Sequence, residues 1–174
     1  GSTIAPGSSI GQLDISGGAS TNGDLTFTGP ATIELEILNP YGNMPGVDYD
    51  FLNVAGAVDF SDTDSLTVKL VSMSDSDTMG NIPGFDADMD FMFRFLQAPG
   101  TAEILDPSNL VIDDSMFSNM NDGEFTVTSD ADGLVLNFSA QGNEIPEPTT
   151  IAIWSLLGLV GTGFAWRKRR KVTR

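Results

Sequence analysis

Hydrophobic and polar residues alternate along most of the chain before Asn143, in short runs separated by glycine, asparagine, aspartate and proline. Three early runs show this best: Leu13–Ile15, Leu25–Phe27 and Ile33–Ile37 each place apolar side chains two residues apart. A period of two puts the apolar side chains on one face of a β-strand and the polar ones on the other. We therefore expect half-buried strands joined by turns.

The pattern continues through Leu52–Phe60, Leu66–Leu70 and Phe91–Leu96. Gly56 replaces one inward residue of the first run, which indicates a bulge or a close backbone approach. The third run is apolar on both faces except at Arg94, and we expect it to be the most buried strand.

The clearest hairpin of the sequence pairs residues 124–128 with residues 134–138, around a loop over 129–133 that ends in glycine. Short helical turns are expected near 107–110 and 114–120, where Asp106 and Asp113 could cap them. No run before residue 143 has an apolar stripe of helical period over three turns. The expected fold class is an all-β body.

Charge divides the chain into two parts of opposite sign. Up to Asn143 there are 22 acidic residues against Lys69 and Arg94, a net charge of −20, whereas the remainder is net positive. Such an acidic body repels phosphate backbones, so we expect no nucleic-acid partner. The chain contains no cysteine and no histidine, which excludes thiolate chemistry and a Ser-His-Asp relay. No carboxylate pair stands out among so many acids, and we expect no enzymatic activity.

One acidic run has the spacing of metal ligands. Asp86, Asp88 and Asp90 alternate as the first ligands of an EF-hand do, but the sixth place is Phe91 instead of glycine and the twelfth is Gln97 instead of glutamate. A calcium site of another kind, made by these three aspartates and backbone carbonyls, is the alternative to a solvated acidic loop. The sequence favours the loop, and no other cofactor is expected.

The C-terminal part predicts one membrane helix. Ile151–Trp166 is sixteen residues long without a charge, near the lower limit for crossing a bilayer. The basic cluster after it, Arg167, Lys168, Arg169, Arg170 and Lys171, would stop transfer and stay in the cytoplasm. We therefore expect an extracytoplasmic body over 1–143, a linker over 144–150, a transmembrane helix over 151–166 and a cytoplasmic tail over 167–174.

The linker contains Pro146, Glu147 and Pro148, which hold the backbone extended in a form that a processing enzyme can bind. A short motif, an apolar helix and a basic end in this order, over residues 145–171, closely resemble the PEP-CTERM sorting signal of Gram-negative bacteria that make extracellular polysaccharide. The resemblance implies export by a signal peptide expected upstream, an inner-membrane-anchored precursor, recognition and cleavage by exosortase near the Pro-Glu-Pro, and sorting to the cell surface or exopolysaccharide. A permanently anchored single-pass protein is the alternative.

The body has a looser resemblance. The stretch from Pro6 to Gly18 and the stretch Tyr49–Gly56 resemble the last coils of right-handed parallel β-helices in autotransporter-like passengers, which implies the C-terminal part of such a helix with its cap. A β-sandwich or β-roll is the alternative fold. A carbohydrate-active or carbohydrate-binding module delivered by the same signal is the alternative function.

Overall fold

The computed structural model describes residues 1–17, 22–98, 109–120 and 122–141, and these residues are mostly β-structure. The strands within these ranges are β1 (Ser2–Ile4), β2 (Gln12–Ile15), β3 (Leu25–Thr28), β4 (Ala31–Ile37), β5 (Phe51–Val54), β6 (Val58–Asp62), β7 (Leu66–Asp75), β8 (Thr78–Met79), β9 (Phe91–Gln97), β10 (Leu110–Met116), β11 (Glu124–Asp130) and β12 (Gly133–Ser139). Across this part of the chain no helix is long and apolar enough to cross a membrane. The helix predicted over 151–166 lies outside the described residues.

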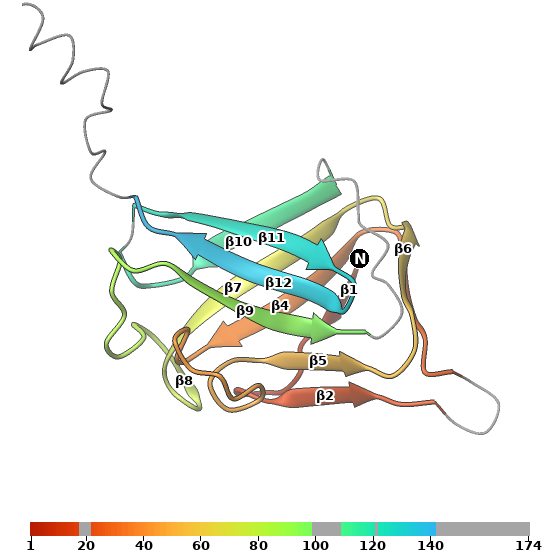
Figure 1. Ribbon diagram of the computed structural model, residues 1–174, viewed down its shortest axis with the longest axis horizontal. Helices are drawn as coiled ribbons and strands as arrows, with labels where there is room; N and C mark the ends of the chain where they lie inside the picture. Colours follow the sequence, from red (N-terminus) through yellow and green to blue (C-terminus); the bar gives the residue numbers. More distant parts are fainter. Residues whose placement is uncertain (18–21, 99–108, 121, 142–174) are drawn as a thin grey trace, which may run out of the picture. The chain divides into compact units, whose positions relative to one another are not determined.

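The chain divides into two compact units, Gly1–Ala140 and Gln141–Arg174. The first unit, the body, contains three sheets (Figure 1). In the first sheet β1, β4, β7 and β10 are parallel neighbours, and β8 pairs antiparallel with β7. The second sheet has the order β11-β12-β9-β5-β2, antiparallel from β11 to β9 and parallel from β9 to β2. The third sheet is the parallel pair of β3 and β6.

The chain visits the three sheets in a repeating order. Strands β1, β2 and β3 lie in the first, second and third sheets, and β4, β5 and β6 do the same. We call each such set of three strands a coil. Parallel pairing places like residues beside one another in successive coils, as in Leu13 beside Leu52 and Leu52 beside Leu96. The inward side chains therefore form apolar columns that run from strand to strand.

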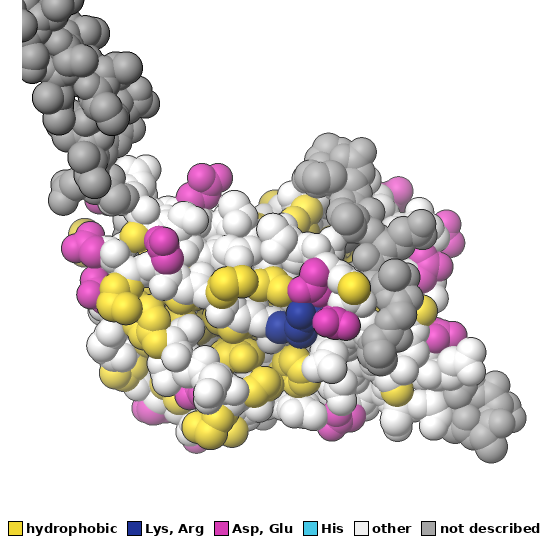
Figure 2. All heavy atoms as spheres, viewed as in Figure 1, with side chains coloured by type: hydrophobic (Ala, Val, Ile, Leu, Met, Phe, Trp, Pro, Cys, Tyr) yellow, Lys and Arg dark blue, Asp and Glu magenta, His cyan; other side chains and the backbone are white. Residues whose placement is uncertain are grey.

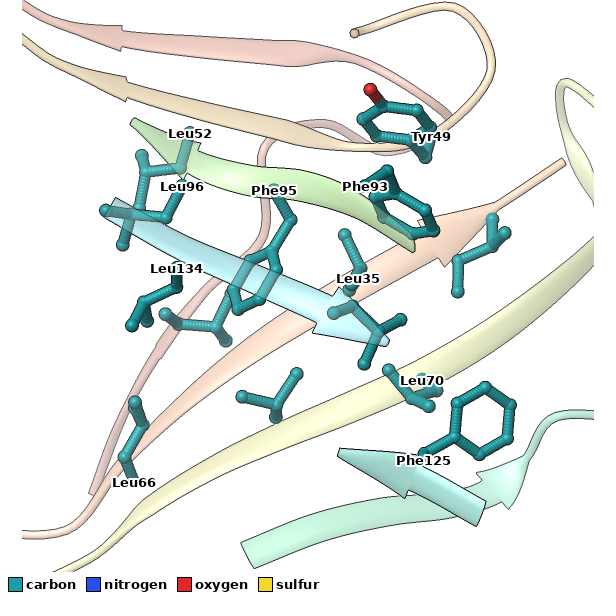
Figure 3. Packing of buried hydrophobic residues seen from close by; sticks show 14 of the residues in the cluster. Leu35, Tyr49, Leu52, Leu66, Leu70, Phe93, Phe95, Leu96, Phe125 and Leu134 are labelled. Atoms are coloured by element: carbon teal, nitrogen blue, oxygen red, sulfur yellow. The ribbon is translucent and has the colours of Figure 1, made fainter. Parts of the chain in front are cut away.

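These columns build the core, which Figure 3 shows between the strands of the first and second sheets. Leu35 and Leu70 are paired in the first sheet and are at most 1% exposed. Aromatic rings continue the same stacking: Phe27 lies over Phe60 with centroids 4.9 Å apart. The period of two in the sequence is thus the signal of a core in which one face of each strand is buried.

Some local predictions are corrected by the structure. Residues 52–60, predicted as one run, form two strands, β5 and β6, which a turn containing Gly56 separates. The predicted close approach there is confirmed, because a Cβ on Gly56 would contact the Asp24 side chain. Strand β9 is not the most buried, since Met92 points outward and is 69% exposed.

The predicted helical turn over 114–120 is also wrong for its first residues, because β10 extends to Met116. The register that pairs Leu110 with Leu66 and Ile112 with Val68 explains the difference. A neighbouring strand supplies hydrogen bonds and apolar contacts that local capping signals do not report.

The predicted hairpin is confirmed, with a shorter turn than expected. Strands β11 and β12 pair from Glu124 and Ser139 to Asp130 and Gly133, so only Ala131 and Asp132 remain unpaired. Gly133 has a φ of 144° and lies so close to the Leu96 carbonyl oxygen that a Cβ would overlap it. Glycine is needed here both for its backbone conformation and for its lack of a side chain.

We expect Gly133→Ala to lower the free energy of unfolding by about 2 kcal/mol or more, since it adds a steric overlap to an unfavourable φ. Gly29→Ala is the matched control, because Gly29 also has a positive φ, 66°, but an added Cβ there would meet no atom within 4 Å. It should cost only about 1 kcal/mol. Urea denaturation of both variants measures the difference, and equal losses would contradict the overlap at Leu96.

Candidate functional site

The residues predicted to carry the sorting function lie outside the described part of the chain. These are Pro146, Glu147 and Pro148, the span over 151–166, and the basic cluster over 167–171. The structure describes the strand that leads to them, because β12 ends at Ser139 and Gln141 is the last described residue before the predicted motif. The Ala140 amide donates a hydrogen bond of 2.8 Å to Asp90 Oδ1, which fixes the chain where it leaves the body.

An aromatic cluster holds this last strand in the core. Phe138 is 1% exposed, and its ring lies 5.0 Å from Phe91 and 4.9 Å from Phe125, measured between centroids. Phe85 and Phe117 complete the cluster through edge-on contacts. Such ring pairs stabilise a fold beyond the area that they bury. The strand before the predicted signal is therefore part of the main core.

The three aspartates of the predicted calcium site act separately. Asp86 Oδ1 accepts a hydrogen bond from the Asp88 amide, and Asp90 Oδ1 accepts the one from Ala140. Over the described ranges, no group of three or more aspartate, glutamate, histidine or cysteine side chains is placed to hold a metal ion. Two of the three carboxylates accept hydrogen bonds from backbone amides, and a calcium site at Asp86, Asp88 and Asp90 stays the alternative to a solvated loop.

Both cations of the body are neutralised locally. Lys69 Nζ lies 2.8 Å from Glu34 Oε2, across the neighbouring strands β7 and β4. Arg94 binds Asp130 through two hydrogen bonds of 2.6 and 2.8 Å. Its guanidinium holds the pKa of Asp130 down to about 2. Figure 2 shows one face of the molecule, with a basic patch flanked by acidic side chains and further acidic groups mostly near the edges of the view.

Asp50 is an acidic residue whose role the sequence did not indicate, although it lies in the stretch Tyr49–Gly56 that carried the β-helix resemblance. Its side chain is 1% exposed. Oδ1 accepts a hydrogen bond of 2.8 Å from the Gly11 amide, just before β2, and Oδ2 accepts one of 3.0 Å from the Glu36 amide in β4. One carboxyl group therefore joins the first sheet to the second.

The surroundings of Asp50 change its acidity. The pKa of Asp50 is raised to about 7, first by burial and then by the negative charges of Glu36 and Glu34, while the two amide donors act in the opposite direction. Burial also raises the pKa of Glu36, with Glu34 and Asp77 adding to the effect. Asp50 is accordingly protonated in the folded protein at mildly acidic pH. Burial of a single aspartate leaves no period or spacing in a sequence, which explains why this group was missed.

The comparison with protein families identifies the C-terminal part of the chain. Residues 144–170 match the family model of the PEP-CTERM protein-sorting motif. This is the PEP-CTERM motif that the order of Pro-Glu-Pro, apolar run and basic end predicted. No curated protein and no solved structure matches the chain.

The PEP-CTERM motif implies a protein that is exported, sorted to the cell surface and processed by exosortase. It covers all three residues of the predicted recognition site and the first four of the basic cluster. The match begins after the last residue of the body, so it assigns no role to the three sheets.

The titration of Asp50 predicts that the protein loses stability as the pH rises from about 5 to about 8. In the folded protein Asp50 keeps its proton up to about pH 7, whereas in the unfolded chain it loses the proton near pH 4. The protonated carboxyl therefore stabilises the fold fully at low pH, and this stabilisation is lost as the pH rises to the folded pKa of about 7. We expect the melting temperature to fall by about 5 °C or more over this window.

Calorimetric melting curves at several pH values test this prediction. Asp50→Asn removes the titrating group and should show a nearly level melting temperature between pH 5 and 8. Asp59→Asn is the control: Asp59 is exposed, and hydrogen bonds from Ser61 lower its pKa, so it titrates below the window. A level curve for the unaltered protein would contradict the assignment to Asp50.

Proposed function

We propose that this protein is an exosortase substrate: an acidic β-rich body exported across the inner membrane and delivered to the cell surface or to extracellular polysaccharide. The observation that carries the proposal is the PEP-CTERM motif over residues 144–170. Its position supports the proposal, because the motif begins four residues after Ala140, the last residue of the folded body. The protein is then the substrate of the sorting reaction and not its catalyst.

In this proposal the C-terminal residues act by position. Pro146 and Pro148 keep the backbone extended around Glu147, so that an enzyme can bind the main chain and place one side chain in a pocket. The apolar run Ile151–Trp166 holds the precursor in the inner membrane as a helix. The residues Arg167–Lys171 remain on the cytoplasmic side, which leaves the body outside.

We infer that the body is the end of a parallel β-helix closed by a cap. Two observations support this fold over a β-sandwich or β-roll. Strands of the first two coils are parallel in all three sheets, with a register shift in the β3–β6 pair alone, whereas sandwiches are built from antiparallel sheets. The antiparallel strands β12 and β11 follow the last parallel pair in the second sheet, as a cap would.

We propose a structural role for the body at the cell surface. Its net charge of −20 and its two paired cations make a hydrated surface that repels other polyanions. The alternative is a carbohydrate-active or carbohydrate-binding module, and an enzyme of this kind needs two carboxylates in a cleft. A hollow lined by Asp90, Phe91, Met92, Asn137, Phe138 and Ser139 lies beside the exit of the chain, and it offers a single carboxylate that already binds Ala140. It favours the structural role.

Co-expression of the precursor with an exosortase in a Gram-negative host tests the sorting function. Mass spectrometry of the mature protein should give a C-terminus near Pro148. Glu147→Ala should slow processing at least about tenfold, because it removes the one charged side chain of the recognition segment. Glu144→Ala, which alters a like charge outside the Pro-Glu-Pro, should be processed normally. A mature protein that ends at Arg174, or equal processing of both variants, would rule out recognition through Glu147.

A further inference from the structure

The first coil has a free edge in all three sheets. Strand β1 pairs with β4, β2 with β5 and β3 with β6, and no described strand lies on their other side. The three free edges belong to consecutive strands of one coil. They therefore form a single surface at one end of the body, which we call the open edge.

Four inward side chains of the first coil are less buried than their partners in the next coil, although Phe27 is only 3% exposed. Ile33, Leu52, Val54 and Val58 are each at most 2% exposed. Their register partners Ile4, Leu13, Ile15 and Leu25 point into the same core but are only partly buried. These four columns thus end with a residue that has a described neighbouring strand on one side alone, and further burial of that residue would be favourable.

Along the open edge, alternate residues have backbone N–H and C=O groups that point away from the second coil. Hydrogen bonds from Leu25 N to Ala57 O and from Ser2 N to Pro30 O direct these amides toward the second coil. Successive peptide groups of a strand point to opposite sides, so Thr26 and Thr3 present their N–H and C=O groups outward. An edge of this kind accepts another parallel strand by main-chain hydrogen bonding.

The opposite end of the body is built differently. The second sheet ends there in the antiparallel strands β12 and β11. The first sheet ends in β10, whose pairing with β7 shifts register between Asp113 and Met116. A register shift and consecutive acidic residues, Asp113 and Asp114, discourage the addition of further strands. The third sheet ends there in β6, which also has no second described neighbour, so the open edge differs from the opposite end in the first and second sheets.

We propose that the open edge is covered by one more parallel coil, formed by polypeptide that precedes Gly1 in the precursor. The links between the third and first sheets support this occupant: two residues separate β3 from β4, and three separate β6 from β7. Strand β1 begins at Ser2. A link of the same length places the end of a strand two or three residues ahead of Gly1, in the third sheet beside β3.

The chemistry of this preceding strand follows from its neighbours. Strands β3 and β6 carry an aliphatic residue followed two positions later by phenylalanine, as Leu25 and Phe27 and as Val58 and Phe60. Phe27 stacks on Phe60 and is itself only 3% exposed, so an added strand would extend this apolar column past Leu25, which is only partly buried. The strand ahead of Gly1 therefore carries apolar residues at alternate positions. The inference rests on the coil arrangement and is independent of sorting by exosortase.

Hydrogen exchange tests the proposal by comparing the 174-residue chain with the precursor that includes the polypeptide encoded ahead of Gly1. We expect amides of β1, β2 and β3 to exchange about 100-fold more slowly in the longer protein, since edge amides become internal. Amides of β12 serve as the internal reference and should not change. Equal exchange at the open edge in both proteins, or upstream sequence without the alternating apolar strand, would overturn the proposal.

A matched pair of variants tests the same edge through the backbone. Thr26→Pro removes an outward N–H without touching the bonds to β6, so it should leave the shorter chain folded and reduce the gain in protection in the longer one at least about tenfold. Thr26→Val keeps the N–H and should behave as the unaltered protein. Sedimentation of the 174-residue chain tests whether a second copy of the chain covers the open edge instead. A dimer in which the amides of β1, β2 and β3 are protected from exchange would show this and overturn the proposal.

Discussion

In the first and second sheets, inward side chains are buried most completely where a like residue lies in the strands on both sides. Leu52 is fully buried because Leu13 lies beside it in β2 and Leu96 beside it in β9. The same condition fixes register, since a shift by one residue would move every apolar side chain of a strand to the solvent face. Parallel pairing in register is therefore the constraint from which sheet order, core and turns follow.

The corner where the chain passes from the first sheet to the second shows what this constraint requires of polar groups. Asp50 satisfies two backbone amides that belong to different sheets, where strand pairing cannot supply an acceptor. Nearby, Asp48 binds the Met44 amide and the Asn39 side chain. Two buried carboxyl groups thus take over, in an irregular connection, the hydrogen bonding that neighbouring strands provide elsewhere.

The sequence predicted the features that repeat locally and missed those that depend on distant partners. Alternation located Ile33–Ile37 and the hairpin around Gly133, because each is visible within a few residues. It could not assign residues 110–116 to a strand, since Leu110 gains its pairing from Leu66, 44 residues earlier. The spacing of Asp86, Asp88 and Asp90 suggested ligands, but the hydrogen bond to Ala140 comes from 50 residues away. The PEP-CTERM motif was recognised because its parts are contiguous.

The bond between Ala140 and Asp90 closes the body before the signal begins. Phe138 is the last fully buried side chain among the described residues, and the matched motif starts six residues later. A cut anywhere in the motif consequently removes no strand, no column residue and no partner of a core hydrogen bond from the described part of the chain. The described strands, columns and hydrogen bonds of the body are therefore made entirely by residues that precede the motif, and none of them needs the motif in order to form.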